Sequence, residues 1–478
     1  MFLTLFAGLS EDRTKRISKF VKECYKETMK PEKMQDRTDY LKLLQQIPVD
    51  PRTIRKKLKL DPHKTTYGVC PKCYFIYDPD SMPRKCQNVV FGKTCNDTVA
   101  KPAVMDGQSV LRPIRPFAVN SYDDFIERLL SRPGMEKLLR DGCSNVEKET
   151  QGSFSELRDI KEGSHLKSFC TPDGKPFMST KAPPDELRIA LACSVDWFNP
   201  LYNKAAGKSV SVGVVAFTVL NLPPALRNRP ENVYVAALIP GPSEPPGENI
   251  NPFLSKIIDI FLRAWEHGCR IQGYSSKWLV RSIIALLIAD LPAARKVSGT
   301  ASHSATVFCP VCNTTKDGIN TITMAWQLRS CEDHLKKARE WREAGSRAQR
   351  KKLFKENGIR WSEFLRLPYW DPTKCVIIDT MHNVLLGIAS YHLRTVLGIE
   401  ELKTANKTGI EKVKEDELRD AIERLRDSPT KEFISKLTVP LLTAICEELG
   451  IYVSPSNGQR VLKDDLVTAV LVRRFTYL

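Results

Sequence analysis

No run of apolar residues in this 478-residue chain approaches the roughly 18 that a membrane-spanning helix needs. The N-terminal segment MFLTLFAGLSEDRTKR has a short apolar stretch, but no basic residue precedes it and charged residues follow directly, so it makes a poor signal peptide. The chain also has no internal repeat and no long low-complexity segment. These absences argue against a helical membrane protein, a secreted protein and a repeat array.

Acidic residues are in deficit, with 56 Asp and Glu against 73 Lys and Arg, a net charge of +17 and a pI near 9.2. Such an excess of positive charge attracts polyanions such as nucleic acid, although it fits a ribosomal, chromatin or membrane-surface protein equally well. The hydrophobic fraction of 42% is enough for real cores, and the length suggests roughly three domains. We therefore expect a soluble protein in a reducing compartment, with the nucleus favoured by its charge.

Fourteen cysteines in a chain of this size point to zinc, because disulfide frameworks belong to small secreted chains. Cys70, Cys73, Cys86 and Cys95 lie in YGVCPKCYFIYDPDSMPRKCQNVVFGKTC, where two cysteine pairs can wrap a tetrahedral thiolate site. The second pair spans eight intervening residues instead of two. Four unliganded buried cysteines are the alternative.

Two aspartates each end a short apolar run, Asp196 in LRIALACSVDWF and Asp290 in SIIALLIADL. Carboxylates at strand ends can face a polar pocket and hold divalent ions such as Mg²⁺ or Mn²⁺. A turn residue or a helix cap is the alternative for each. Cys309 and Cys312 follow as a CPVC pair, a zinc half-site whose other two ligands must come from elsewhere.

The order of the patterns predicts an α/β protein around an RNase H-like mixed sheet. Three β-branched runs, an amphipathic helix and a further apolar run follow one another from about residue 185, and the first and fourth strands of that fold carry the first two catalytic acids. Upstream, SYDDFIERLL is expected to be a helix capped by Ser121. The predicted segments are a basic helical region (1–62), a zinc-ribbon-like four-cysteine module (63–110), a linker and helical region (111–184), the core with the CPVC pair (185–324), a basic helical insertion with a DxMHN segment (325–400) and a C-terminal helical module (430–478).

Two basic segments are candidate DNA contacts. The insertion carries Lys336, Lys337, Arg350, Lys351 and Lys352, although a solvated charged helix is the common alternative. The C-terminal module resembles a SAP domain, a small DNA-associated helical unit, with an apolar stripe formed by Leu437, Leu441, Leu442, Ile445 and Leu449. Its candidate phosphate contacts are Lys463, Arg473 and Arg474. An ordinary helical hairpin is the alternative there.

Several motifs together resemble the CACTA-type (En/Spm-like) DNA transposases of plant and fungal genomes. They are SVDWFNP, the NLPP of VLNLPPALRNRP, ADLPAARKVSG followed by CPVC, and IIDTMHNVLLG, in that order and spacing. The upstream IPVDPRTIRKKLKLDPHKTTYGVCPKC is similar to the fungal branch. The resemblance covers roughly residues 40 to 395.

The resemblance implies an RNase H-like nuclease that excises and inserts DNA between terminal inverted repeats. Asp196 and Asp290 match its first two metal acids. Its third acid, usually Glu, and two histidines that complete the CPVC zinc site lie further downstream in the family, and no His…His…Glu segment is recognisable here. We therefore expect a C-terminally truncated chain. Candidate substitutes within it are Asp379 as third acid, which as readily caps the following helix, and His382, His392 or His303 as zinc ligands.

Three hypotheses follow. The first is a metal-dependent transposase that acts on double-stranded DNA, with homo-oligomerisation left open. The second is an inactive, truncated or domesticated transposase that binds DNA through its zinc ribbon, basic helices and SAP-like tail. The third is a fragment of a decayed gene without stable activity.

Overall fold

A computed structural model describes residues 11–28, 34–57, 62–105, 107–147, 159–179, 181–200, 210–319, 326–399, 415–427, 430–451, 453 and 461–472. The chain divides into two compact units, Met1–Gly387 and Ile388–Leu478. Within the described ranges, every helix is too short or too polar to cross a bilayer.

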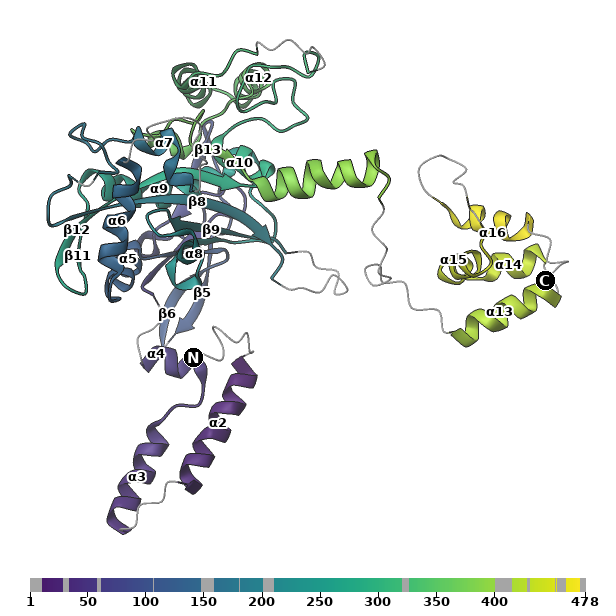
Figure 1. The fold of residues 1–478 in the computed structure, drawn as a ribbon, viewed down its shortest axis with the longest axis horizontal. Helices are drawn as coiled ribbons and strands as arrows, with labels where there is room; N and C mark the ends of the chain where they lie inside the picture. The colour runs from purple at the N-terminus through teal and green to yellow at the C-terminus, as the bar shows by residue number, and fades with distance from the viewer. Residues whose placement is uncertain are drawn as a thin grey trace. The chain divides into compact units, whose positions relative to one another are not determined.

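The first unit is built on a large mixed sheet (Figure 1). Its central strands are β8 (Glu186–Phe198), β9 (Val212–Val219), β10 (Val233–Ile239), β12 (Lys277–Ala289) and β13 (Val376–Ile378). Strands β8, β9 and β10 pair antiparallel in sequence order, whereas β12 runs parallel to β8 and β13 parallel to β12. The predicted mixed α/β class is confirmed.

The sheet continues beyond these strands on both sides. The antiparallel strand β11 (Cys269–Gln272) pairs with the first part of β12. On the other side, β10 pairs with β7 (Pro116–Asn120), which pairs with β1 (Lys64–Val69), and β1 pairs with β2 (Ile76–Tyr77). Strand β7 lies in the segment predicted as a linker, so this segment joins the start of the four-cysteine module to the main sheet.

Burial explains why the central strands form. The first eight residues of β8 are buried, as expected for a strand covered on both faces, whereas burial in β9 alternates residue by residue. The amphipathic helix α9 (Asn251–Glu266) packs on β12, and α6 (Met135–Glu147) packs on β8. In the core, aromatic rings of β9, β10 and α9 contact one another and those of residues 122–125.

Local capping signals set several helix ends. Helix α5 (Tyr122–Leu130) begins at the predicted cap, because Ser121 accepts a hydrogen bond from the backbone N–H of Asp124. The basic stretch after residue 325 forms two helices, α11 (Cys331–Glu343) and α12 (Arg347–Asn357). They are separated at Gly345, a weak helix former, and Ser346 caps the second. The other α-helices and β-strands described in this unit are α2 (Glu11–Thr28), α3 (Met34–Gln46), α4 (Pro51–Lys57), β3 (Val89–Val90), β4 (Lys93–Thr94), β5 (Ala100–Met105), β6 (Gln108–Pro113), α7 (Ser164–Lys167), α8 (Pro224–Arg227) and α10 (Leu291–Ser298).

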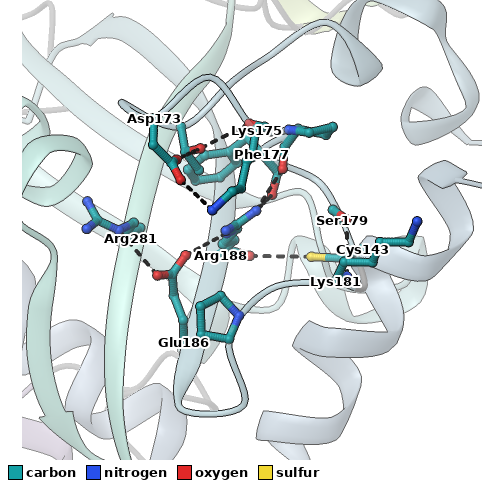
Figure 2. Close-up of polar contacts among 12 residues, drawn as sticks. Cys143, Asp173, Lys175, Phe177, Ser179, Lys181, Glu186, Arg188 and Arg281 are labelled. Carbon is teal, nitrogen blue, oxygen red and sulfur yellow. Dashed lines mark hydrogen bonds and ion pairs between the residues drawn. The ribbon is translucent and has the colours of Figure 1, made fainter.

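A buried ion-pair network fixes the amino-terminal ends of β8 and β12. Glu186 accepts a hydrogen bond of 2.6 Å from Arg188 Nε and one of 3.4 Å from Arg281 Nε (Figure 2). Arg188 also donates to the Pro176 carbonyl at 2.7 Å. Because Arg281 is the cross-strand partner of Arg188, the network holds the two parallel strands in register.

The second unit is helical and has its own apolar cluster. Its helices are α13 (Glu415–Asp427), α14 (Lys431–Lys436), α15 (Val439–Glu448) and α16 (Lys463–Val472). Of the predicted apolar stripe, Leu441, Leu442 and Ile445 are buried, and Leu437 and Leu449 pack partly buried against them.

Candidate functional site

Two of the predicted acids lie at the same edge of the sheet. The register of the parallel strands pairs Leu287 of β12 with Cys193 of β8. Asp290 lies three residues beyond Leu287, and Asp196 lies three residues beyond Cys193. Since parallel strands end at the same edge, the pairing directs both carboxylates to it.

The third candidate acid follows the neighbouring strand. Ile378 of β13 pairs in parallel with Ala289 of β12, and the next residues are Asp379 and Asp290. Three adjacent parallel strands, β8, β12 and β13, therefore each lead to an aspartate at one edge. We call this set, Asp196, Asp290 and Asp379, the acid edge.

Each acid also has a local backbone partner. The Asp196 carboxylate accepts from the N–H of its neighbour Trp197 at 2.7 Å. Asp290 accepts from Ala293 N–H at 2.7 Å and caps α10. Asp379 accepts from Met381 N–H at 3.0 Å, at the start of the helical segment Met381–Ala389. These side chains therefore do make the hydrogen bonds expected of helix caps and turn residues, which is the alternative to a role as metal ligands.

His382 is the cationic candidate at the acid edge. Its ring Nδ1 pairs with the Asp379 carboxylate. This hydrogen bond raises the pKa of His382, and the charges of Asp290 and Asp196 act in the same direction, so the three acids form one field of negative charge. The same hydrogen bond lowers the pKa of Asp379. His382 is therefore protonated more readily there than a free histidine is.

The four cysteines of the predicted zinc module do come together. Among the described residues, Cys70, Cys73, Cys86 and Cys95 are the one set of three or more cysteine, histidine or acid ligand atoms that all lie within 4.8 Å of one another. The sulfur atoms of Cys70 and Cys95 are 3.7 Å apart, and those of Cys73 and Cys86 are 3.5 Å apart. A tetrahedral zinc ion with Zn–S bonds of about 2.3 Å requires S···S distances of about 3.8 Å. The donor set therefore fits zinc.

Hydrogen bonds prepare two of these thiols for metal binding. Tyr77 donates its hydroxyl to Cys86 Sγ at 3.3 Å, and Asn88 Nδ2 lies 3.6 Å from Cys73 Sγ. Burial raises the pKa of Cys86, but hydrogen bonds from the Tyr77 hydroxyl and the Asn88 backbone N–H, together with the neighbouring thiols, outweigh it and leave that pKa lowered. Burial dominates at Cys70 and Cys73 and raises the pKa of both. A bound cation would reverse that preference by stabilising the thiolates.

The long spacing between the second pair of cysteines has a structural cause. Strands β3 and β4 form a hairpin whose turn residues, Phe91 and Gly92, both have positive φ angles, of 48° and 77°. This hairpin occupies the intervening residues and returns Cys95 to the module, where its N–H donates to the Asn88 carbonyl. The eight-residue spacing therefore does not prevent the four thiols from meeting.

The CPVC pair gathers no further ligand within the described part of the chain. The backbone N–H of Cys312 lies 3.4 Å from Cys309 Sγ, and the buried guanidinium of Arg329 donates to the Cys309 carbonyl at 2.9 Å. Among the residues that the structure describes, the two thiols belong to no set of three or more cysteine, histidine or acid ligand atoms that all lie within 4.8 Å of one another. Of the histidines considered as partners, His303 is exposed and His392 belongs to the second unit.

The side chains that are candidate DNA contacts in the insertion differ in whether other residues of the chain already bind them. Arg350 is engaged, because its guanidinium lies 4.8 Å from the Trp341 ring centre and 5.0 Å from that of Phe91, at the tip of the four-cysteine hairpin. It also donates to the Arg342 carbonyl at 2.8 Å. Arg350 therefore links α12 to the four-cysteine module.

The lysines are more exposed. Lys337 pairs with Asp333 at 2.6 Å, and Lys352 lies 4.0 Å from Glu356. Lys336, Lys351 and, in the second unit, Lys463 are exposed. Arg473 and Arg474 lie outside the described residues.

Comparison with known proteins finds a similarity in the middle of the chain. Residues 172–352 match the family model described as "Transposase family tnp2". This match supports a transposase. The matched segment contains Asp196, Asp290 and the CPVC pair, but it begins after the four-cysteine module and ends before Asp379. No curated protein matches the chain.

Sequence patterns did not predict two features of the structure. The contact of Arg350 with Phe91 joins residues far apart in sequence, and nothing in either local segment predicts it. The buried pair of Glu186 and Arg188 gave only the weak signal of two charges at the start of an apolar run.

Proposed function

We propose that this chain is a DNA transposase-like protein of the CACTA family with an RNase H-like core. It binds the terminal inverted repeats of an element in the nucleus and performs metal-dependent strand cleavage and transfer. The observation that carries the proposal is the acid edge, where three adjacent parallel strands each lead to an aspartate, two of them inside the segment matched to a transposase family. The strand order β10-β9-β8-β12-β13 supports the RNase H-like assignment.

The acids have separate roles in this proposal. Asp196 and Asp290 hold Mg²⁺ or Mn²⁺, Asp379 serves as the third acid, and His382 holds the Asp379 carboxylate in place. When bound, such ions activate a water or 3′-hydroxyl and stabilise the leaving oxygen. Zinc at the four cysteines has a structural role, because that module is too small to form a large core.

The test is cleavage of a labelled inverted-repeat end by the purified full chain with Mg²⁺ or Mn²⁺. We expect nicking that Asp196→Ala abolishes. Asp80→Ala is the matched control, since Asp80 is exposed in the four-cysteine module and far in sequence from the acid edge. Absence of cleavage under every metal condition, or equal activity of both variants, would sink the proposal.

A second candidate is a DNA-binding protein that does not cut. The favouring observation is that each acid already has a backbone partner, and the carboxylates of the described acid edge are not gathered within 4.8 Å of one another. Such a protein should bind DNA with an affinity that falls steeply with salt and should show no cleavage with any metal. Salt-independent binding would exclude it.

A further inference from the structure

The four-cysteine module has an open hollow of about 1030 Å³ on its surface. Its lining includes three cationic side chains, Arg84, Lys85 and Lys101. Thr98, Gln87 and Asn96 add neutral hydrogen-bonding groups, and no carboxylate or aromatic side chain contributes to the lining.

The three cations are exposed, and no ion pair involves them within the described part of the chain. By contrast, another charged residue of the same module, Asp78, does form an ion pair, with Lys256 of α9 at 3.0 Å. Three like charges around one hollow repel each other, so an anion that enters it is favoured over water and dilute counterions.

The backbone under these cations is fixed by hydrogen bonds. The N–H of Val99 donates to the Arg84 carbonyl, and Lys85 forms a bridge with Thr98. Lys101 lies on β5, which pairs with β6. Cys86, which is 1% exposed, is one of the residues that line the hollow. The positive charges therefore project from a rigid scaffold that the metal site would stiffen further.

We propose that this hollow binds the phosphate backbone of duplex DNA without reading the bases. Cations, amides and hydroxyls are the groups that contact phosphates in protein–DNA complexes. Proteins that hold single strands add aromatic side chains on which bases stack, and the lining has none. The inference rests on the DNA binding of the proposed function and names a surface for it outside the segment matched to the transposase family.

The test compares two triple variants of the full chain. Arg84→Gln, Lys85→Gln and Lys101→Gln remove the charges of the hollow. The control removes three exposed positive charges of the same module that do not line it, through Lys64→Gln, Lys72→Gln and Lys93→Gln. Both variants lower the net charge equally, so general electrostatic attraction changes equally.

The readout is the affinity for a mixed-sequence duplex across a series of salt concentrations. Log K falls with log salt, with a slope of about −0.9 for each phosphate contact. Loss of three contacts should therefore make the negative slope shallower by about 2.7. We expect a change below about 1 for the control. A charge-conserving variant, Arg84→Lys with Lys85→Arg and Lys101→Arg, should keep the wild-type slope.

Three results would overturn the proposal. Equal slope changes in both triple variants would mean that the cations of the hollow contribute no more to DNA binding than other surface cations do. Tighter binding of single strands than of duplex would assign it to another ligand. Loss of zinc from the hollow variant with an unchanged slope would mean that the cations only balance the thiolates. Failure of the wild-type chain to bind DNA at all would instead refute the proposed function itself.

Discussion

Asp290 allows its structural and catalytic roles to be separated by substitution. The carboxylate accepts the N–H of Ala293 at 2.7 Å and caps α10. Asparagine caps a helix about as well as aspartate, whereas alanine cannot cap it. Asp290→Asn therefore removes the negative charge and retains the hydrogen bond, and Asp290→Ala removes both.

The two substitutions have different expected magnitudes. Loss of an N-cap destabilises a protein by about 1 kcal/mol, within about 0.5 to 2. Helix α10 is short, and Ala293, Ala294 and Val297 are buried, so fraying of its first turn would expose core contacts. We expect Asp290→Ala near the upper part of that range. Asp290→Asn loses only the interaction of the charge with the helix dipole, about 0.3 to 1 kcal/mol.

Metal binding, unlike stability, should respond alike to both substitutions. If Asp290 is a metal ligand, both substitutions should weaken Mn²⁺ binding by at least about tenfold, since even changes outside the ligand shell do so. Ser346→Ala, which removes the cap of α12, is the control for capping without a metal role. Calorimetric titration with Mn²⁺ gives the affinity, and amide hydrogen exchange in α10 gives the local stability. Wild-type Mn²⁺ affinity in Asp290→Asn would refute the metal-ligand role and leave Asp290 as a cap.

Three further results are expected. Glu186→Ala should destabilise β8 by about 3 to 5 kcal/mol, because it leaves Arg188 buried without its carboxylate; Glu186→Leu with Arg188→Met should lose much less, as hydrogen exchange of β8 would report. Burial lowers the pKa of His334 to about 4 from 6.5, so between these pH values the unfolded state binds a proton that the folded state does not. The free energy of unfolding should therefore rise with pH across this window, by at most about 3 kcal/mol. Urea unfolding of His334→Gln at several pH values should show this rise removed. Cys73→Ser should remove zinc that Cys170→Ser retains, measured by mass spectrometry; equal zinc contents would contradict the site.

Local features of the fold could be predicted because they depend on neighbouring residues. The apolar runs before Asp196 and Asp290 form β8 and β12, and Ser121 caps α5 as its spacing predicts. The mixed α/β class follows from the order of such runs. The gathering of four thiols could be anticipated from composition, but the hairpin that accommodates the long spacing before Cys95 depends on the backbone of Phe91 and its neighbour.

Non-local features could not be predicted in the same way. The sequence shows apolar runs but not which run lies beside which, so the pairing of β1 with β7 and of β13 with β12 had no local signal. Charge counts predict a basic insertion, yet Arg350 is held between two aromatic rings while Lys351 remains exposed. Whether a cation is free depends on tertiary contacts that a charge pattern does not contain.

The acid edge depends on strand direction more than on spacing along the chain. Asp290 and Asp379 are separated by the CPVC pair and by α11 and α12, and yet they follow adjacent strands. A parallel pair requires a crossover connection that returns the chain to the start of the next strand, and that strand then ends at the same edge as its neighbour. The insertion can therefore change in length or surface charge without moving Asp379 from its place beside Asp290. This separation lets one segment present cations while the three parallel strands lead their aspartates to the same edge.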